Sequence, residues 1–176
     1  YQEIIFELKP DIIVECGTGC GGSSLFLASI CDMIDKGRVI TIDIEDKEGR
    51  PQHKRITYLL GSSTSEDIVE QVRKLISPKD KVMVSLDSAH DKDHVLEELR
   101  IYSRLVTRGS YIIVEDTNLS GHPVVPTDEL GPMEAVEEFL KDNKGFVIDK
   151  TREKFYLSFN PNGYLKKIDQ PTNQSV

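Results

Sequence analysis

Acidic side chains and one histidine follow two of the apolar runs in this sequence. Asp87 and His90 end one run, and Glu115 and Asp116 end the next. If both runs are parallel strands, their carboxyl ends meet at one edge of a sheet and bring the three acids together. Three carboxylates in one place repel one another, and Mg²⁺, which takes oxygen ligands, removes that repulsion. We therefore predict a magnesium site held by Asp87, Glu115 and Asp116. The alternative is that some of these acids cap helices or pair with Arg and Lys.

His90 is the histidine best placed for proton transfer. It alone follows a carboxylate at a strand end, where a neutral imidazole can accept a proton, so His90 and Asp87 are the predicted catalytic residues. His53 lies in a polar stretch and His94 at the start of a predicted helix, so we expect surface or capping roles for both. His122 could face the site.

A glycine-rich segment occupies residues 15–22, Glu-Cys-Gly-Thr-Gly-Cys-Gly-Gly. Glycines let the backbone turn sharply and approach a ligand closely, and the helix that follows points its free N–H groups at the same place. The segment fits the dinucleotide fingerprint G-x-G-x-x-G, and its E-x-G-x-G-x-G pattern resembles the S-adenosylmethionine loop of class I methyltransferases. Asp43, at the end of the next run, can accept hydrogen bonds from both ribose hydroxyls, which suits NAD and S-adenosylmethionine equally and disfavours NADP. A tight turn without a ligand is the remaining interpretation.

Apolar runs alternate with amphipathic stretches along the whole chain. The pattern predicts strands at residues 11–16, 38–44, 56–60, 81–87, 110–115, 146–149 and 154–159, and helices at 22–35, 65–76, 93–106 and 132–142. This alternation is typical of an α/β fold with a mostly parallel sheet covered on both faces. The last two strands are joined by a loop too short for a crossover, so we expect them to be antiparallel. In the first predicted helix, much of the apolar surface should come from Leu25, Ala28, Ile30 and Met33.

Length and composition narrow the function further. The chain has 176 residues, 38% of them hydrophobic and 30% charged, which fits one ordinary globular domain. We predict this domain over residues 1–168 and a polar tail at 169–176. The net charge of −8 disfavours nucleic acid as a partner. No apolar run is long enough to span a membrane. The first residues show no basic or apolar signal-peptide region, so we expect no signal peptide. Three cysteines without C-x-x-C spacing favour reduced thiols and a cytoplasmic location.

A long segment rich in Gly and Pro, residues 117–131, begins beside the predicted acidic cluster. Long loops in compact domains usually serve as lids or mobile segments, so we predict a lid on the substrate side. Near the start of the chain, Phe6 and Leu8 could pack on a second copy, which leaves a homo-oligomer open.

Motifs at the predicted strand ends form one set that covers nearly the whole chain. They lie at residues 1–3, 9–11, 15–24 (ECGTGCGGSS), 43–44, 61–64, 86–90 (LDSAH), 114–117 (VEDT), 131–135 and 159–163 (FNPNG). This set resembles the cephalosporin-hydroxylase-like group of class I methyltransferases, which includes rhamnosyl O-methyltransferases. The resemblance implies a Rossmann-like seven-stranded sheet, mostly parallel with an antiparallel last strand and helices on both faces. It implies S-adenosylmethionine and Mg²⁺ as cofactors, and transfer of a methyl group to a hydroxyl of a small molecule or sugar.

The same resemblance implies roles for individual residues. Gly17, Gly19 and Gly21 would pass the methionine part of the cofactor, Asp43 would bind ribose, and Ser62 and Ser63 would lie near adenine. The full cofactor-binding set that it implies is Glu15, Gly17, Thr18, Gly19, Gly21, Ser23, Asp43, Gly61, Ser62, Ser63, Asp87 and Ser88. Catechol-type O-methyltransferases have a similar layout, with a basic lysine three residues after the first metal aspartate, a place taken here by His90. Members of the group carry more residues before the stretch that matches Tyr1, so we expect that a helix which precedes this stretch in them is absent from the present sequence.

Other functions stay open at this point. An NAD-dependent oxidoreductase would explain the glycines and Asp43 but would leave Asp87, Glu115 and Asp116 without a role. A non-haem iron oxygenase needs two histidines and one carboxylate, whereas these strand ends carry carboxylates and at most one histidine. A non-catalytic relic of the methyltransferase fold would keep the domain without the cofactor. The identity of the methyl acceptor is not encoded in these motifs.

Overall fold

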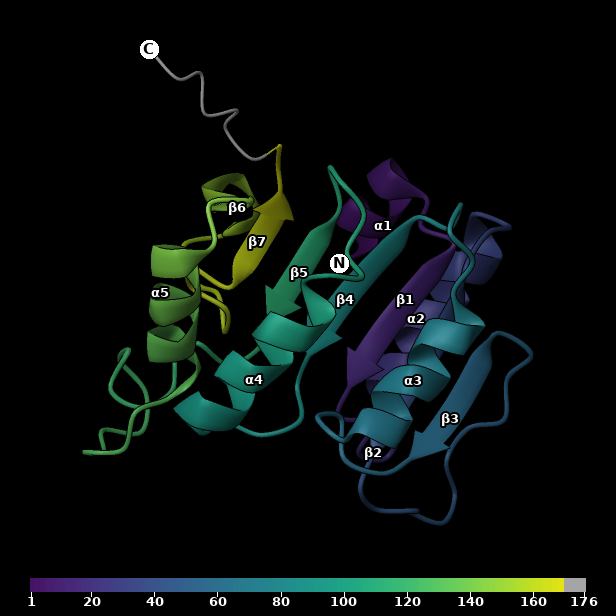
Figure 1. Ribbon diagram of the computed structural model, residues 1–176, viewed down its shortest axis with the longest axis horizontal. Coiled ribbons are helices and arrows are strands. Elements are labelled where there is room, and N and C mark those ends of the chain that lie inside the picture. The colour runs from purple at the N-terminus through teal and green to yellow at the C-terminus, as the bar shows by residue number, and fades with distance from the viewer. Residues whose placement is uncertain (170–176) are drawn as a thin grey trace.

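Seven strands form one sheet in the order β3-β2-β1-β4-β5-β7-β6 in the computed structural model, which describes residues 1–169 (Figure 1). The strands are β1 (Ile12–Cys16), β2 (Arg38–Asp43), β3 (Ile56–Leu60), β4 (Val82–Leu86), β5 (Tyr111–Val114), β6 (Phe146–Ile148) and β7 (Tyr164–Lys167). The first five strands are parallel, and β7 is antiparallel to both β5 and β6. The predicted α/β fold with an antiparallel last strand is confirmed. Except for Asp169, the tail predicted at 169–176 lies outside the described residues.

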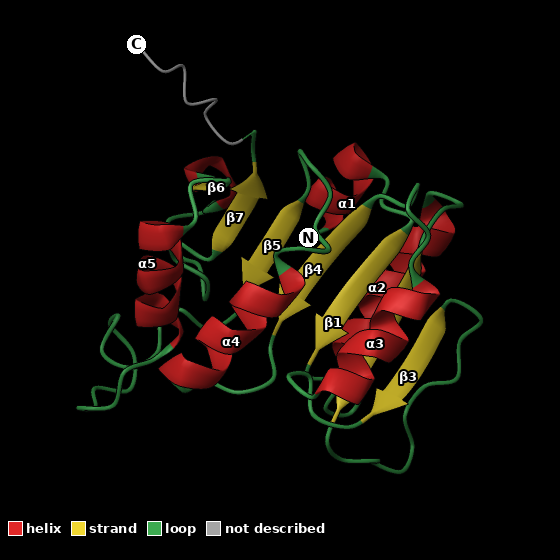
Figure 2. Cartoon of the chain, viewed as in Figure 1, coloured by secondary structure: helices red, strands yellow, loops and turns green. Residues whose placement is uncertain are grey.

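Helices cover both faces of this sheet. They are α1 (Gln2–Leu8), α2 (Gly22–Met33), α3 (Glu66–Leu75), α4 (Lys92–Tyr102), α5 (Pro132–Asp142) and the short 3₁₀ helix η1 (Lys150–Arg152). Figure 2 shows α3 and α4 in front of the sheet and α1 and α2 behind it, while α5 packs against α4. Within residues 1–169, no helix is long and apolar enough to cross a membrane.

Alternating side chains along the strands create two hydrophobic cores. Val14, Val84 and Ile112 pack toward α3, α4 and α5, whereas Ile13 and Met83 pack toward α1 and α2. Successive strand residues point to opposite faces, so a sheet covered on both sides needs apolar residues at consecutive positions. This requirement explains why continuous apolar runs predicted β1, β2, β4 and β5, whereas the edge strand β3 has no fully buried residue.

Two of the four apolar residues predicted for this helix, Ala28 and Ile30, lie on the buried face of α2. Leu25 and Met33 were expected to supply apolar surface but are 37% and 70% exposed. The stripe that packs on the sheet consists of Leu27, Ala28, Ile30 and Cys31. Apolar residues lie on most sides of this helix, so its spacing does not define one stripe, and docking on the sheet decides which side is buried.

The strand predicted at residues 154–159 is wrong. Phe155 and Tyr156 are exposed and have positive φ angles of 62° and 60°, which a strand does not accommodate. The last strand is β7, whose Leu165 is fully buried beside β5 and β6. The run of aromatic residues at 154–159 is typical of a strand, but β7 takes the position next to β5. The expected antiparallel pairing of the last two strands holds for β6 and β7.

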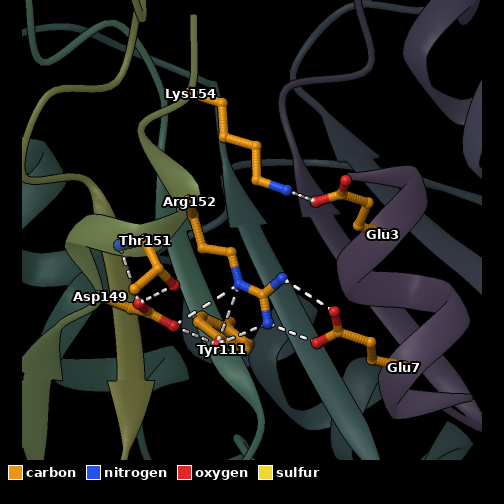
Figure 3. A network of polar contacts seen from close by, with 7 residues as sticks. All are labelled: Glu3, Glu7, Tyr111, Asp149, Thr151, Arg152 and Lys154. Carbon is orange, nitrogen blue, oxygen red and sulfur yellow. Dashed lines mark hydrogen bonds and ion pairs between the residues drawn. The ribbon is translucent and has the colours of Figure 1, made fainter.

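The helix α1, where the sequence predicted no element, is joined to the C-terminal part of the chain by ion pairs (Figure 3). Arg152 donates two hydrogen bonds to the Glu7 carboxylate, at 3.1 and 2.5 Å, and Lys154 pairs with Glu3. The Arg152 guanidinium also lies 5.5 Å from the centre of the Tyr111 ring. Because Arg152 contacts both α1 and β5, it holds the segment that follows β6 against the face of the sheet that α1 covers.

We expect Arg152→Ala to lower the midpoint of thermal unfolding more than Arg108→Ala does. Arg152 is largely buried and contacts several groups, whereas Arg108 is 74% exposed and pairs with the exposed Asp169. Exposed ion pairs contribute little to stability. In a domain of this size, each kcal/mol lost lowers the midpoint by roughly 2–4 °C. Scanning calorimetry of both variants tests this, and equal midpoints would contradict a fastening role for Arg152.

Candidate functional site

A pocket of about 330 Å³ opens at the carboxyl ends of β1, β2, β3 and β4. It is lined by most of the residues predicted to bind a cofactor, namely Gly17, Gly19, Asp43, Gly61, Ser62, Ser63, Asp87 and Ser88. It is also lined by residues that the sequence did not assign to a cofactor: Ile42, Ile44, Glu45, Lys47, Ala89 and His94. The parallel strands bring these segments together because their carboxyl ends share one edge of the sheet.

Gly17 allows the loops after β1 and β4 to touch. Its φ is 95°, and a Cβ at this position would lie 1.9 Å from the Asp87 carbonyl oxygen. The Asp87 N–H donates to the Cys16 carbonyl at 2.7 Å, which continues the pairing of the two strands into their loops. A residue with a side chain at position 17 would both strain the backbone and push the two loops apart.

Four residues of the predicted cofactor set do not line the pocket. The Glu15 carboxylate is buried and accepts hydrogen bonds from Ser24 and, at 2.6 Å, from Thr41, whose Oγ1 is in turn 2.6 Å from that of Thr18. Glu15 and Thr18 therefore hold β1, β2 and the start of α2 together beneath the glycine loop. The other two are Gly21, which faces Pro51, and Ser23, which is exposed on α2.

Asp43 lies at the end of β2 with its carboxylate already held by protein groups. It accepts hydrogen bonds from the N–H groups of Gly19 at 2.7 Å and Glu45 at 3.0 Å, and it pairs with Arg50 at 3.2 Å. Partial burial alone would raise the pKa of Asp43, but these donors and the Arg50 charge outweigh it and lower the pKa. Arg50 also donates to the Gly19 carbonyl at 3.0 Å. The sequence placed Arg50 in an unassigned polar stretch, and no local signal marked its position beside Asp43.

Two of the predicted metal ligands meet His90 at the end of β4 and β5. One ligand atom each from Asp87, His90 and Asp116 lie within 4.8 Å of one another. His90 Nε2 is 2.9 Å from Asp116 Oδ2 and 3.8 Å from Asp87 Oδ1. Burial, followed by the charges of Glu115 and Asp116, raises the pKa of Asp87 to about 7, although His90 partly offsets this. Asp87, which resists ionisation, and the neighbouring Asp116 together fit a hard cation such as Mg²⁺, which takes oxygen ligands.

Glu115, the third predicted metal ligand, lies outside this cluster. Its carboxylate accepts a hydrogen bond from the Tyr1 hydroxyl and another from Asn160 Nδ2 at 2.7 Å. Side chains alternate along a strand, so Glu115 points to the face that carries Ile113, the face of α1 and α2. Burial raises the pKa of Glu115, and the bonds from Tyr1 and Asn160 counteract the rise. The arrangement makes Glu115 a support beneath the cluster, and its predicted role as a metal ligand stays a prediction.

Asn160 is the residue of this region that sequence reasoning left without a role. Its Oδ1 accepts a hydrogen bond from the Asp116 N–H at 3.0 Å while its Nδ2 donates to Glu115. The side chain therefore holds both acids at the end of β5. The signal was its place in the FNPNG motif, where Gly163 lies so close to β5 that a Cβ would be 2.3 Å from the Val114 carbonyl oxygen.

A second hollow, of about 740 Å³, lies between the start of α4 and the loop at residues 117–131. It is lined by His90, Asp91, Lys92, Asp93, Leu119, Ser120, Val125, Thr127, Glu129 and Leu130. The loop contains no helix or strand and begins at the acidic cluster, which agrees with the position predicted for a lid. His122 does not line the hollow, because its Nε2 is held 2.6 Å from Glu134 on α5. His90 is thus the imidazole shared by the acidic cluster and the hollow.

We expect Gly17→Ala to destabilise the fold more than Gly49→Ala. Both glycines have positive φ, but nothing lies within 4 Å of a Cβ at Gly49, whereas one at Gly17 collides with the backbone of Asp87. Gly49→Ala therefore measures the backbone strain alone, about 1–2 kcal/mol. Urea unfolding of the two variants gives the comparison, and equal free energies of unfolding would contradict a close contact between the β1 and β4 loops.

The metal-free protein should lose stability as the pH rises from about 4 to 7. The raised pKa of Asp87 means that the folded state binds its proton more tightly than the unfolded state does in this window. Stability then falls with rising pH, because the folded state must give up a proton that it favours. Solvent screening at this partly exposed carboxyl reduces the effect. Thermal unfolding in chelator-treated buffer measures it, and Asp87→Asn should flatten this part of the profile.

Comparisons with known proteins identify the family to which this chain belongs. The family model described as rhamnosyl O-methyltransferase/CmcI matches residues 1–168. A rhamnosyl O-methyltransferase of Mycobacterium leprae (strain TN) is 39% identical over 171 residues, which cover 94% of this chain and 75% of that protein. A rhamnosyl O-methyltransferase of Mycobacterium tuberculosis (strain H37Rv) is also 39% identical, over 94% of this chain and 70% of its own length.

Solved structures with the same fold share less sequence. A CmcI structure with Mg and SAM superposes with a TM-score of 0.71 at 21% identity and covers 96% of this chain and 69% of its own. The MycE methyltransferase from the mycinamycin biosynthetic pathway, in complex with Mg and SAH, gives a TM-score of 0.66 at 16% identity, over 97% of this chain and 49% of its own. From the family model and the relatives at 39% identity, we conclude that this chain is a member of the rhamnosyl O-methyltransferase/CmcI family.

Proposed function

We propose that this protein is an O-methyltransferase that uses S-adenosylmethionine and Mg²⁺ to methylate a hydroxyl of a sugar or small molecule. The observation that carries the proposal is the order of three features along one sheet edge. The glycine-lined pocket adjoins the Asp87–Asp116 cluster, and His90 of that cluster also lines the hollow under the 117–131 loop. Methyl donor, cation and acceptor would then lie side by side.

The first pocket suits a nucleoside with a positively charged sulfonium. A carboxylate offers about four acceptor sites, and Asp43 uses three of them for Gly19, Glu45 and Arg50. The remaining site can accept a hydrogen bond from a ribose hydroxyl. At the other side of the pocket, Asp87 supplies negative charge near the place where the sulfonium would lie.

Asp87 and Asp116 are the residues that would hold Mg²⁺. The bound cation supplies positive charge that lowers the pKa of a nearby hydroxyl and orients it. His90 is placed to take the proton. Its Nε2 lies 2.9 Å from Asp116 Oδ2, and if it donates there, Nδ1 is the nitrogen of the neutral ring that accepts. The 117–131 loop excludes water from the acceptor and holds it in line with the methyl group, and such orientation contributes several kcal/mol.

The class of acceptor, the compartment and a possible second copy are inferred from the second hollow, the net charge, the cysteines and the surface of α1. The second hollow combines apolar side chains, Leu119, Val125 and Leu130, with charged ones, which suits an amphipathic hydroxyl compound such as a glycoside. The net charge of −8 argues against nucleic acid as the substrate. Three free cysteines favour the cytoplasm. Phe6 is 63% exposed on α1, which leaves a face for a second copy.

An NAD-dependent oxidoreductase is the alternative that shares this pocket, because Asp43 would bind the ribose of either ligand. It leaves the cluster of Asp87, His90 and Asp116 without a role. A non-catalytic relic of the fold would be expected to lose such a costly cluster of acids, because their repulsion destabilises the fold.

Substitutions of Asp43 and Asp116 should affect different steps, the first cofactor binding and the second methyl transfer. We expect Asp43→Asn to raise the Kd for S-adenosylhomocysteine about tenfold, the loss of one hydrogen bond to a charged group. Asp116→Asn should keep this affinity but lower Mg²⁺-dependent methyl transfer by about a hundredfold or more. Calorimetric titration with S-adenosylhomocysteine and NAD, each with and without Mg²⁺, and a transfer assay with rhamnosides provide the data.

Two results would contradict the proposal. Binding of NAD without S-adenosylhomocysteine would favour the oxidoreductase. Equal loss of cofactor affinity in the two variants would show that the pocket and the acidic cluster are not separate sites.

A further inference from the structure

A buried carboxylate that the proposed chemistry does not use lies behind the wall of the first pocket. Glu98 on α4 is fully buried. Its Oε1 accepts hydrogen bonds from Ser63 Oγ at 2.5 Å and from Ser88 Oγ at 2.7 Å. Its Oε2 has no partner among the described residues. Ser63 and Ser88 line the pocket from the loops after β3 and β4, so Glu98 joins two walls from behind.

Three residues of α4 act on the same loop. His94, Glu98 and Tyr102 are spaced four residues apart and therefore share one face of the helix. His94 Nε2 lies 3.3 Å from Ser63 Oγ, and the Tyr102 hydroxyl donates to the Ser63 carbonyl at 2.7 Å. Both the side chain and the backbone of Ser63 are thereby fixed, and little freedom is left for its hydroxyl to turn.

The direction of these hydrogen bonds decides what the pocket offers to a ligand. Glu98 Oε1 is the acceptor of both hydrogen bonds, and a serine hydroxyl has one proton and two lone pairs. Ser63 and Ser88 both donate their proton to Glu98, so neither has one left for the pocket. The Ser88 side chain is exposed and lines the pocket, where its oxygen can only accept. His94 also contacts Glu98, and this hydrogen bond raises the pKa of His94.

We propose that Glu98 is a specificity-determining positioning residue: by holding the proton of the Ser88 hydroxyl, it makes this wall an acceptor that selects a 6-amino purine over a 6-oxo purine. The inference rests on the proposed function, which places the adenine of S-adenosylmethionine in this pocket. The amino group of adenine donates to such a wall, whereas the carbonyl of hypoxanthine meets another acceptor. An unpaired polar group on either side of a contact costs affinity, which is the basis of the discrimination.

The test compares the Kd for S-adenosylhomocysteine with that for S-inosylhomocysteine, its 6-oxo analogue, by calorimetry on the full chain. The wild-type protein should prefer the amino compound about tenfold or more. Glu98→Gln keeps the shape, but its amide can donate to Ser88 and free the hydroxyl to turn, so the ratio should fall toward one. Ser88→Ala removes the oxygen and should give the same loss even if Glu98→Gln does not fold. Glu97→Gln is the matched control, because Glu97 is the exposed neighbour on the same helix, and its ratio should equal that of the wild type.

A wild-type protein that binds both compounds equally, or a Glu98→Gln variant that keeps the full ratio, would overturn this inference and leave the proposed function intact. A wild-type protein that binds neither compound would overturn the proposed function and, with it, the assignment of a purine to this wall. The effect of Glu98 on its neighbour His94 can also be measured without a ligand. Titration of the His94 ring by NMR should show a lower pKa in Glu98→Gln than in the wild type or Glu97→Gln, and an unchanged pKa would overturn the role of Glu98.

Discussion

The contact between the Gly17 backbone and the Asp87 carbonyl is the constraint on which the site depends. β1 pairs with both β2 and β4, so its carboxyl end lies at the centre of the parallel part of the sheet. Only a residue without a side chain lets the loops after β1 and β4 meet there. With these two loops in contact, Asp87 is part of two sites. It lines the first pocket, and it forms the acidic cluster with His90 and Asp116. A cofactor and a cation can therefore be neighbours only because position 17 is glycine.

Three buried or largely buried carboxylates support the functional residues from behind. Glu15 holds the threonines beneath the glycine loop, Glu98 holds the hydroxyls of the pocket wall, and Glu115 is tied to Tyr1 and Asn160 beneath the acidic cluster. Each accepts hydrogen bonds from groups on other elements, so one buried carboxyl group fixes several segments at once. The exposed acids are the candidate ligand-binding groups, and the buried acids hold the surrounding segments in place. A count of acidic residues at strand ends does not distinguish these two roles.

The negative charge of the Asp87–His90–Asp116 cluster would be balanced by the positively charged ligands that we expect there. Burial, followed by the charges of Glu115 and Asp116, raises the pKa of Asp87, and a cation or a sulfonium bound at this edge would relieve the repulsion between these acids. His90 shares in this balance and also reaches the hollow under the 117–131 loop. The same repulsion that weakens the empty fold would strengthen the binding of positively charged partners.

The sequence by itself determined the parallel sheet, the glycine loop, Asp43 and the Asp87–Asp116 pair, because continuous apolar runs and the residues that end them are local features. It also predicted the antiparallel last strand, although it placed that strand at 154–159 instead of β7. Only the tertiary structure decided which side of α2 is buried, that Glu115 points away from Asp116, and that Arg50 and Glu98 serve the pocket. Those facts depend on which face of a strand or helix meets which neighbour, and residues far apart in the chain settle that when the layers pack.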